Sequence, residues 1–177
     1  KNGGETIYTV AGSKAACFEQ TKADLFGAFN PAGLTSSAIE KATLNRADGE
    51  SFTLRADSEP DIAADSADSA DSSTYRTVWR LAGEPAAELD ETKVNSLLSA
   101  LSSYVSSQIT GAGPAAYGFD APSLTAEVTT AEGTVTLYYA ANADGCWMMQ
   151  AGDSSVYAVD LDTLSTLLQT ADSLKAE

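Results

Sequence analysis

The sequence predicts an α+β fold in which antiparallel sheets carry amphipathic helices on one face and are built from repeated strands-then-helix units. Three observations indicate this architecture. Residues 7–25 and 156–174 superpose without a gap, each as a short strand followed by a helix-like stretch. Residues 47–54 resemble residues 131–137, because both hold an Ala-acid-Gly turn followed by alternating apolar side chains. A Trp-bearing strand and then an amphipathic helix follow each of these turns, and this order favours antiparallel pairing.

A first helix is expected between Ser13, which can cap it, and the Asn-Pro-Ala-Gly sequence at 30–33, which ends it. The positions on its apolar stripe are Cys17, Phe18, Thr21, Leu25 and Phe26. Because such a stripe must be covered, we expect residues 1–38 to be the terminal strand-helix of a preceding repeat unit. They should dock on a main domain of residues 39–177.

Strand patterns begin at Ile39, and Asp48-Gly49 between two alternating runs predicts a β-hairpin. A further strand contains Trp79. Between these strands, residues 57–73 are mostly Asp, Ser and Ala, with few apolar side chains to bury. This composition predicts a mobile acidic insert.

The clearest helix is predicted over residues 91–105, where apolar positions recur at the spacing of one helical face. Those positions are Val94, Leu97, Leu98, Leu101, Tyr104 and Val105. Asp90 is a suitable N-cap, and Leu89 with Val94 has the spacing of a hydrophobic staple. Strands follow over residues 124–159, with a second hairpin at 131–133, and a final helix is expected through Leu174.

The composition excludes several classes of function. The chain has 177 residues, with 10 Lys and Arg against 25 Asp and Glu, and a formal net charge of −15. Such a charge repels nucleic acids and anionic lipid headgroups. The absence of His removes the commonest general base and the commonest nitrogen ligand for zinc. We therefore expect no enzymatic activity and no cofactor.

The acidic residues and the cysteines form no recognisable site. Asp61, Asp65, Asp68 and Asp71 have oxygen ligands, but their spacing lacks the glycine and the bidentate Glu of an EF-hand, which favours a solvated segment over a calcium site. Three acids are candidates for a carboxylate pair by number alone: Glu127, Glu132 and Asp144. Cys17 and Cys146 leave two alternatives open, one long-range disulfide or two buried thiols. Catalytic, metal-binding and cofactor-binding residues are therefore predicted to be absent.

Aromatic side chains are the remaining candidates for a binding surface. They are Trp79, Tyr117, Phe119, Tyr138, Tyr139 and Trp147. Each lies in or beside an expected strand, where aromatic residues usually fill the core, so core packing is favoured over an exposed platform. Tyr138 and Tyr139 are neighbours in one strand, so one of them should point away from the core.

Three stretches together resemble a known family. They are Val-Trp-Arg-Leu at 78–81, the Leu-rich segment at 90–101, and Tyr-Gly-Phe-Asp-Ala-Pro at 117–122. Their order, with the 131–133 hairpin and the 156–159 strand, is similar to the bacterial domain of unknown function DUF4340. The resemblance covers residues 39–168. It implies an extracytoplasmic location in the cell envelope and an N-terminal membrane anchor that this sequence lacks, and it carries over no site residues.

Two functional hypotheses follow. The first is a non-enzymatic interaction or scaffolding module of a membrane-anchored envelope protein, with a protein partner such as an envelope transporter component. The alternative is a small-ligand or carbohydrate-binding domain with a pocket between the repeat copies, lined by Trp147, Tyr117 or Tyr139.

Overall fold

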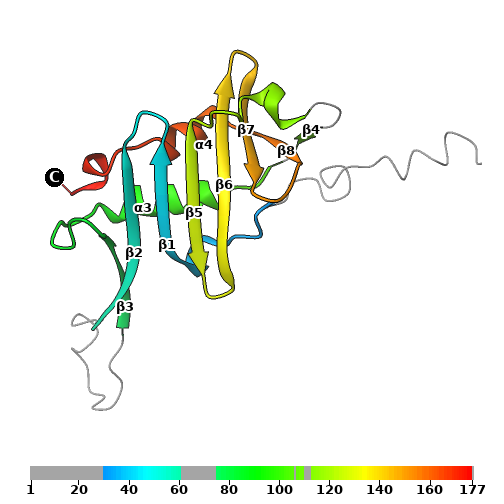
Figure 1. Ribbon diagram of the computed structural model, residues 1–177. Helices are drawn as coiled ribbons and strands as arrows, with labels where there is room; N and C mark the ends of the chain where they lie inside the picture. Colours follow the sequence, from blue (N-terminus) through cyan, green and yellow to red (C-terminus); the bar gives the residue numbers. More distant parts are fainter. Residues whose placement is uncertain (1–29, 61–74, 106, 110–112, 177) are drawn as a thin grey trace, which may run out of the picture.

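The computed structural model in Figure 1 describes residues 30–60, 75–105, 107–109 and 113–176. Within these residues, eight strands form one antiparallel sheet in the order β3-β2-β1-β5-β6-β7-β8-β4. The strands are β1 (Ile39–Arg46), β2 (Ser51–Pro60), β3 (Tyr75–Leu81), β4 (Gln108–Ile109), β5 (Leu124–Thr130), β6 (Gly133–Asn142), β7 (Gly145–Gln150) and β8 (Val156–Val159). The helical elements are η2 (Ser36–Ala38), α3 (Glu91–Leu101), η3 (Pro114–Tyr117), α4 (Leu161–Leu167) and η4 (Asp172–Leu174).

The predicted α+β fold, with several sheets built from repeated strands-then-helix units, is wrong. The described strands all belong to one large sheet, and α3 and α4 are short. The cause is the pairing of β1 with β5, in which Thr43 lies opposite Glu127. This pairing joins two hairpins that are far apart in the sequence. Hydrophobic periodicity identifies each strand, but it does not identify so distant a partner.

The two Trp-bearing strands are similar in sequence, but their tryptophans have different positions in the structure. In β3, Trp79 lies opposite Ala56, on the side of the sheet to which the buried Leu54 points. In β7, Trp147 lies opposite Ala140, on the other side from the buried Tyr139. Since successive side chains of a strand alternate between the two faces, the two tryptophans lie on opposite faces of the sheet.

The hairpin predicted at Asp48-Gly49 is confirmed. β1 and β2 are antiparallel neighbours, and the amide of Arg46 donates to the carbonyl of Glu50 over 2.8 Å to close the turn. Gly49 has a φ of +92°, in the region that favours glycine. The second predicted hairpin, between β5 and β6, is confirmed by the same kind of pairing.

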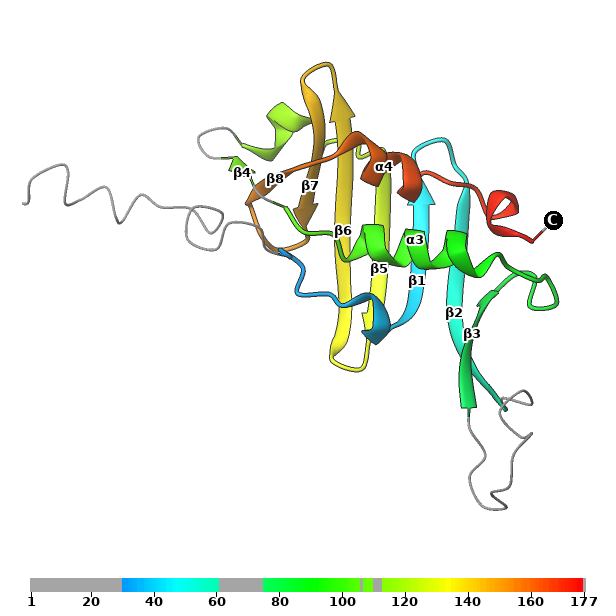
Figure 2. The ribbon, with the colours of Figure 1, turned by 180° about the vertical axis from the view of Figure 1, so that it is seen from behind.

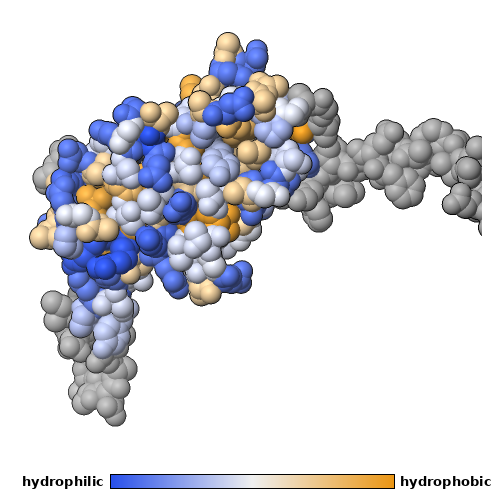
Figure 3. All heavy atoms as spheres, viewed as in Figure 1, coloured by the Kyte–Doolittle hydropathy of each residue, from blue (hydrophilic) through white to orange (hydrophobic). Residues whose placement is uncertain are grey.

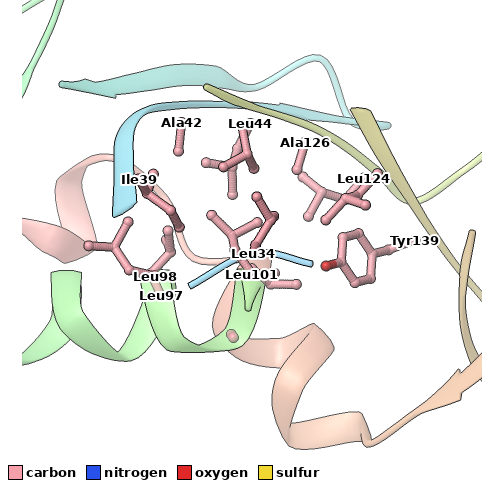
Figure 4. Packing of buried hydrophobic residues seen from close by; sticks show 14 of the residues in the cluster. Leu34, Ile39, Ala42, Leu44, Leu97, Leu98, Leu101, Leu124, Ala126 and Tyr139 are labelled. Atoms are coloured by element: carbon pink, nitrogen blue, oxygen red, sulfur yellow. The ribbon is translucent and has the colours of Figure 1, made fainter. Parts of the chain in front are cut away.

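The sheet has one apolar and one polar face. Both α-helices cross the apolar face, as Figure 2 shows, and Figure 4 shows part of the core between them and the sheet. Fully buried side chains of this core are Leu44, Leu54, Val94, Leu97, Leu101, Leu124, Val128, Leu137, Tyr139, Tyr157, Leu167 and Leu174. The face turned toward the viewer in Figure 3 is a mixture of hydrophilic and less polar residues. Hydroxyl side chains such as those of Thr43 and Thr53, 3.0 Å apart, lie on this face of the sheet.

Helix α3 begins as predicted and ends earlier. The Asp90 side chain accepts from the amides of Thr92 and Lys93, which confirms the N-cap. The predicted extension to residue 105 is wrong, because the helix ends at Leu101. The carbonyl of Ser102 accepts instead from the side-chain amide of Asn30 over 3.0 Å, so the chain can leave the helix without losing this hydrogen bond.

The ends of the described chain differ from the sequence-based prediction in detail. The final helix stops at Leu167, and only the short η4 follows before Lys175. Of the segment predicted to dock, residues 30–38 are described, and Leu34 is buried in the core. Residues 57–60 of the predicted insert lie in β2, while 61–74 lie outside the described residues, as do residues 1–29. None of the described helices has the length and apolar character needed to cross a bilayer.

Candidate functional site

The two edges of the sheet are strands of different length. β4 contributes two residues, Gln108 and Ile109, whereas β3 contributes the seven residues of Tyr75–Leu81. Beside β3 lies a groove of about 560 Å³. One wall is β3 itself, and the other is the segment of residues 86–89 with the first turn of α3. This groove is our candidate site.

The outward edge of β3 presents unpaired backbone groups to the groove. The amide of Ala82 donates to the carbonyl of Thr53 over 2.9 Å, so alternate residues from Ala82 back along β3 bond to β2. Leu81, Trp79 and Thr77 therefore direct their N–H and C=O groups away from β2. The Leu81 carbonyl accepts from Glu84. Thr77 and Trp79 have no backbone partner on this edge among the described residues.

The floor of the groove is apolar and firmly held. Trp79 and Leu89 are partly buried and pack against the core, and Val94 is 1% exposed. The capped start of α3 fixes Val94, and the C-terminal segment fixes Leu89, because the amide of Ala176 donates to the carbonyl of Glu88 over 3.0 Å. The floor is therefore preformed.

Charges around the groove are partly neutralised. Arg80 pairs with Glu59 through a short hydrogen bond that raises the pKa of its guanidinium, and its Nε lies 3.8 Å from Asp57. On the opposite wall, Glu88 and Glu91 are exposed and make no ion pair with a described residue. The same holds for Arg76 on the strand wall. Two unpaired acids against one unpaired base leave the lining net negative.

A family model, the domain of unknown function DUF4340, matches residues 79–177, from Trp79 in β3 to the end of the chain. The chain belongs to the DUF4340 family. No curated protein and no solved structure matches it. The matched part of this DUF4340 chain contains α3 and β5–β8, so the groove lies where the matched part begins.

The aromatic residues singled out in this DUF4340 sequence do not form one platform. Trp147 and Tyr117 form an edge-on pair with ring centroids 4.9 Å apart. Tyr139 is on the other face, 1% exposed in the core, where burial strongly raises the pKa of its hydroxyl. Tyr138 is partly exposed, which confirms that one of the two neighbouring tyrosines points away from the core. Phe119 is partly buried near η3. The 560 Å³ groove contains neither Tyr117 nor Trp147.

The three acids that were candidates for a carboxylate pair lie in different elements of the described structure. Glu127 is exposed in the middle of β5, and Glu132 and Asp144 occupy the exposed turns before and after β6. Cys146 is a buried free thiol in β7. Cys17 and the four aspartates at 61, 65, 68 and 71 lie outside the described residues. Among the residues that are described, no group of three metal-binding side chains forms.

Sequence reasoning missed the groove, although it found three of its residues. Leu89 and Val94 were expected as a staple, and both line the groove, while Trp79 lies in a strand as expected. No sequence pattern predicted that β3 would be an edge strand. The one local signal is the pair Arg76 and Arg80, since charged side chains commonly protect sheet edges from unwanted pairing.

Proposed function

We propose that this DUF4340 chain is a non-enzymatic interaction module that recognises a protein partner along β3. The observation that carries the proposal is the unpaired edge of Thr77 and Trp79 above a preformed apolar floor. Proteins seldom leave a long edge strand open, because it pairs readily with other chains. An open edge next to a concave surface is therefore suited to controlled binding.

The location belongs to the same proposal and is supported by the family. The module is proposed to act outside the cytoplasm, on a bacterial envelope protein held by a membrane anchor. The family name itself assigns no activity. The lack of histidine and the separation of Glu127, Glu132 and Asp144 support a non-enzymatic role. Components of envelope transporters are the first partners to test.

Site-specific cross-linking tests this function in the full-length, anchored protein. A photoreactive amino acid at Thr77 is compared with the same amino acid at Thr134, which is exposed on the polar face of β6. Irradiation of intact envelopes should give a protein adduct from Thr77 and none from Thr134, and mass spectrometry then identifies the partner. Adducts from Thr134 alone would contradict the groove as the binding surface. Adducts from neither position would contradict the proposed function as an interaction module.

A further inference from the structure

We propose that residues 5–10 of this chain occupy the groove as an additional strand on β3, so that a protein partner must displace them before it binds there. The displacement rests on the interaction function proposed above, whereas the contact within the chain does not. Residues 5–10 have the sequence Glu-Thr-Ile-Tyr-Thr-Val and lie outside the described residues. A strand added to a sheet edge gains main-chain hydrogen bonds and packs alternate side chains into neighbouring pockets.

The groove has a place for one more strand. Thr77 and Trp79 lie two residues apart, which is the spacing at which one strand offers successive hydrogen-bonding positions to a neighbour. The Leu81 carbonyl is already bonded to Glu84, so pairing ends there. An added strand with the length of residues 5–10 therefore covers β3 up to Trp79.

Residues 156–174 show how the repeated sequence pattern packs in the folded chain. β8 pairs with β7, and α4 then crosses the apolar face of the sheet (Figure 2). Residues 7–25 align with this segment, 7 with 156 and 25 with 174, and an apolar side chain stands at the position of each of its buried residues. These apolar counterparts are Ile7, Tyr8, Ala15, Phe18 and Leu25.

The same pattern favours the same arrangement for residues 7–25, a strand along a sheet edge followed by a helix on the apolar face. The position beside β7 is filled by β8. Of the two edges that the described strands leave, β4 has two residues and β3 has seven. The edge of β3 is therefore the one that can pair with a strand of this length.

The chain is long enough to reach the groove from the first described residue. Asn30 donates to the carbonyl of Ser102 at the end of α3, whereas the groove lies beside Val94 near the start of this helix. α3 has 11 residues and is therefore about 16 Å long. The helix predicted between Ser13 and Asn30 would span about 24 Å. An antiparallel course beside α3 thus brings residues 5–10 to β3.

Alternate side chains of the segment suit the apolar floor of the groove. Tyr157 is fully buried in the core, and Tyr8 is its counterpart. When Tyr8 points to the helix-covered side of the sheet, Val10 points there as well, because every second side chain of a strand shares a face. These two side chains then cover Trp79 and Leu89, which pack against the core from the floor.

The other face of the segment carries no positive charge. Its side chains are those of Glu5, Ile7 and Thr9. They share the side of the sheet to which Arg76 and Arg80 point. Arg76 makes no ion pair with a described residue. The added strand therefore brings a glutamate to this face, and no like charge meets the arginines.

Photocross-linking in the purified 177-residue chain tests the contact directly. A photoreactive amino acid at Thr77 should form an adduct with the tryptic peptide of residues 2–14, and the product should keep the mass of one chain. The same amino acid at Thr134, exposed on the other side of the molecule in β6, should give no such adduct. Absence of the Thr77 adduct, or an adduct that joins two chains, overturns the proposal.

Amide hydrogen exchange measured by NMR is a second test, and it leaves β3 unchanged. The outward amides of Thr77 and Trp79 should exchange slowly in the wild-type chain. Tyr8→Asp, which places a charge on the apolar floor, should speed their exchange at least about tenfold. Thr9→Asp places the same charge on the face of Arg76 and should change these rates less than about twofold. Rapid exchange in the wild-type chain, or equal effects of the two variants, overturns the proposal.

The outcomes separate this inference from the interaction function. In intact envelopes, Tyr8→Asp should raise the yield of partner adducts from Thr77, because the segment no longer competes with the partner. An unchanged yield overturns the displacement. Partner adducts without an adduct to residues 2–14 leave the interaction function standing and overturn only this inference. An adduct to residues 2–14 with no partner adduct in either form overturns the function and supports the contact within the chain.

Discussion

The two edges of the sheet are protected by different means. β4 is two residues long and pairs with β8, so it has few backbone groups to offer. β3 has seven residues, carries Arg76 and Arg80, and borders the groove. A short edge offers few backbone groups to any partner, whereas charged side chains disfavour only partners of like charge. The comparison teaches that β3 is the edge at which selective pairing is possible.

The two sides of the sheet, β1–β3 and β7–β8–β4, also differ in their ion pairs. Every ion pair between described residues involves Arg46, Arg55, Arg80 or Lys175. These residues lie in β1–β3 or in the C-terminal segment that pairs with the chain before α3. On the β7–β8–β4 side, the side chain of Gln108 donates to Ser155, and the Asp153 carboxylate accepts from the Ser155 amide and the Tyr157 hydroxyl. Salt should therefore act mainly on the β3 side, where the ion pairs between described residues lie.

The largest expected effect tests whether the two sides fold as one unit. Leu54 in β2 and Leu137 in β6 are both fully buried and belong to one core. Leu54→Ala and Leu137→Ala should each lower the free energy of unfolding by about 2–5 kcal/mol. Urea titrations are followed by the fluorescence of Trp79 in a Trp147→Phe background and of Trp147 in a Trp79→Phe background.

Each leucine substitution should shift both fluorescence transitions by the same amount, because each tryptophan borders the same cooperative sheet. The two single-tryptophan parents without a leucine change serve as controls. If Leu54→Ala shifts the Trp79 transition alone, then the β3 side unfolds independently, and the comparison of the edges becomes one between two separate units.

A smaller effect is expected at the helix N-termini. Asp90 accepts hydrogen bonds from two amides at the start of α3, over 2.9 Å from Thr92 and 3.2 Å from Lys93. Asp160 occupies the same position before α4 and makes no side-chain cap. Asp90→Ala should therefore cost about 1 kcal/mol in thermal or urea unfolding, and Asp160→Ala only a few tenths. Equal costs would show that charge near the helix ends, rather than capping, is what stabilises both helices.

The Asp90 cap also illustrates what the sequence predicts well. The cap, the 48–49 turn and the single face of residues 94–101 depend on side chains within a few residues of each other, and the structure has all three. The early end of α3 was missed, and there the Ser102 carbonyl accepts from the side chain of Asn30, which is far away in the sequence.

The candidate site was missed for the same physical reason. Trp79, Leu89 and Val94 have ordinary roles in a strand or a helix, and they become a groove only because nothing in the described chain pairs with the far side of β3. Which strand lies at an edge depends on every other pairing in the sheet, and above all on β1 with β5. Strand order is a property of the whole chain, and short patterns do not determine it.

The smallest expected effect concerns the change in the free energy of unfolding at acid pH. Lys175 binds Asp172 and Glu84, each over 2.8 Å, and ties the C-terminal segment to the loop after β3. The hydrogen bond from Lys175 lowers the pKa of Asp172 below its ordinary value of 3.8. A lowered pKa in the folded state means that the carboxylate stabilises the fold above pH 3.8, and that this stabilisation is lost as the pH falls through the lower, folded value.

Asp172→Asn should therefore reduce stability slightly at neutral pH and make the loss of stability below pH 4 less steep. Because the carboxylate is exposed, the change will be small, and 0.5 M salt should remove most of it in the wild-type protein as well. Urea titrations from pH 2.5 to 7 measure it, with Asp162→Asn as a control, since Asp162 has no ion pair with a described residue. An identical pH profile for Asp172→Asn and the control would show that Lys175 is held by Glu84 and the backbone alone. The two sides of the sheet would then differ in the pairing of their edges and not in their response to acid.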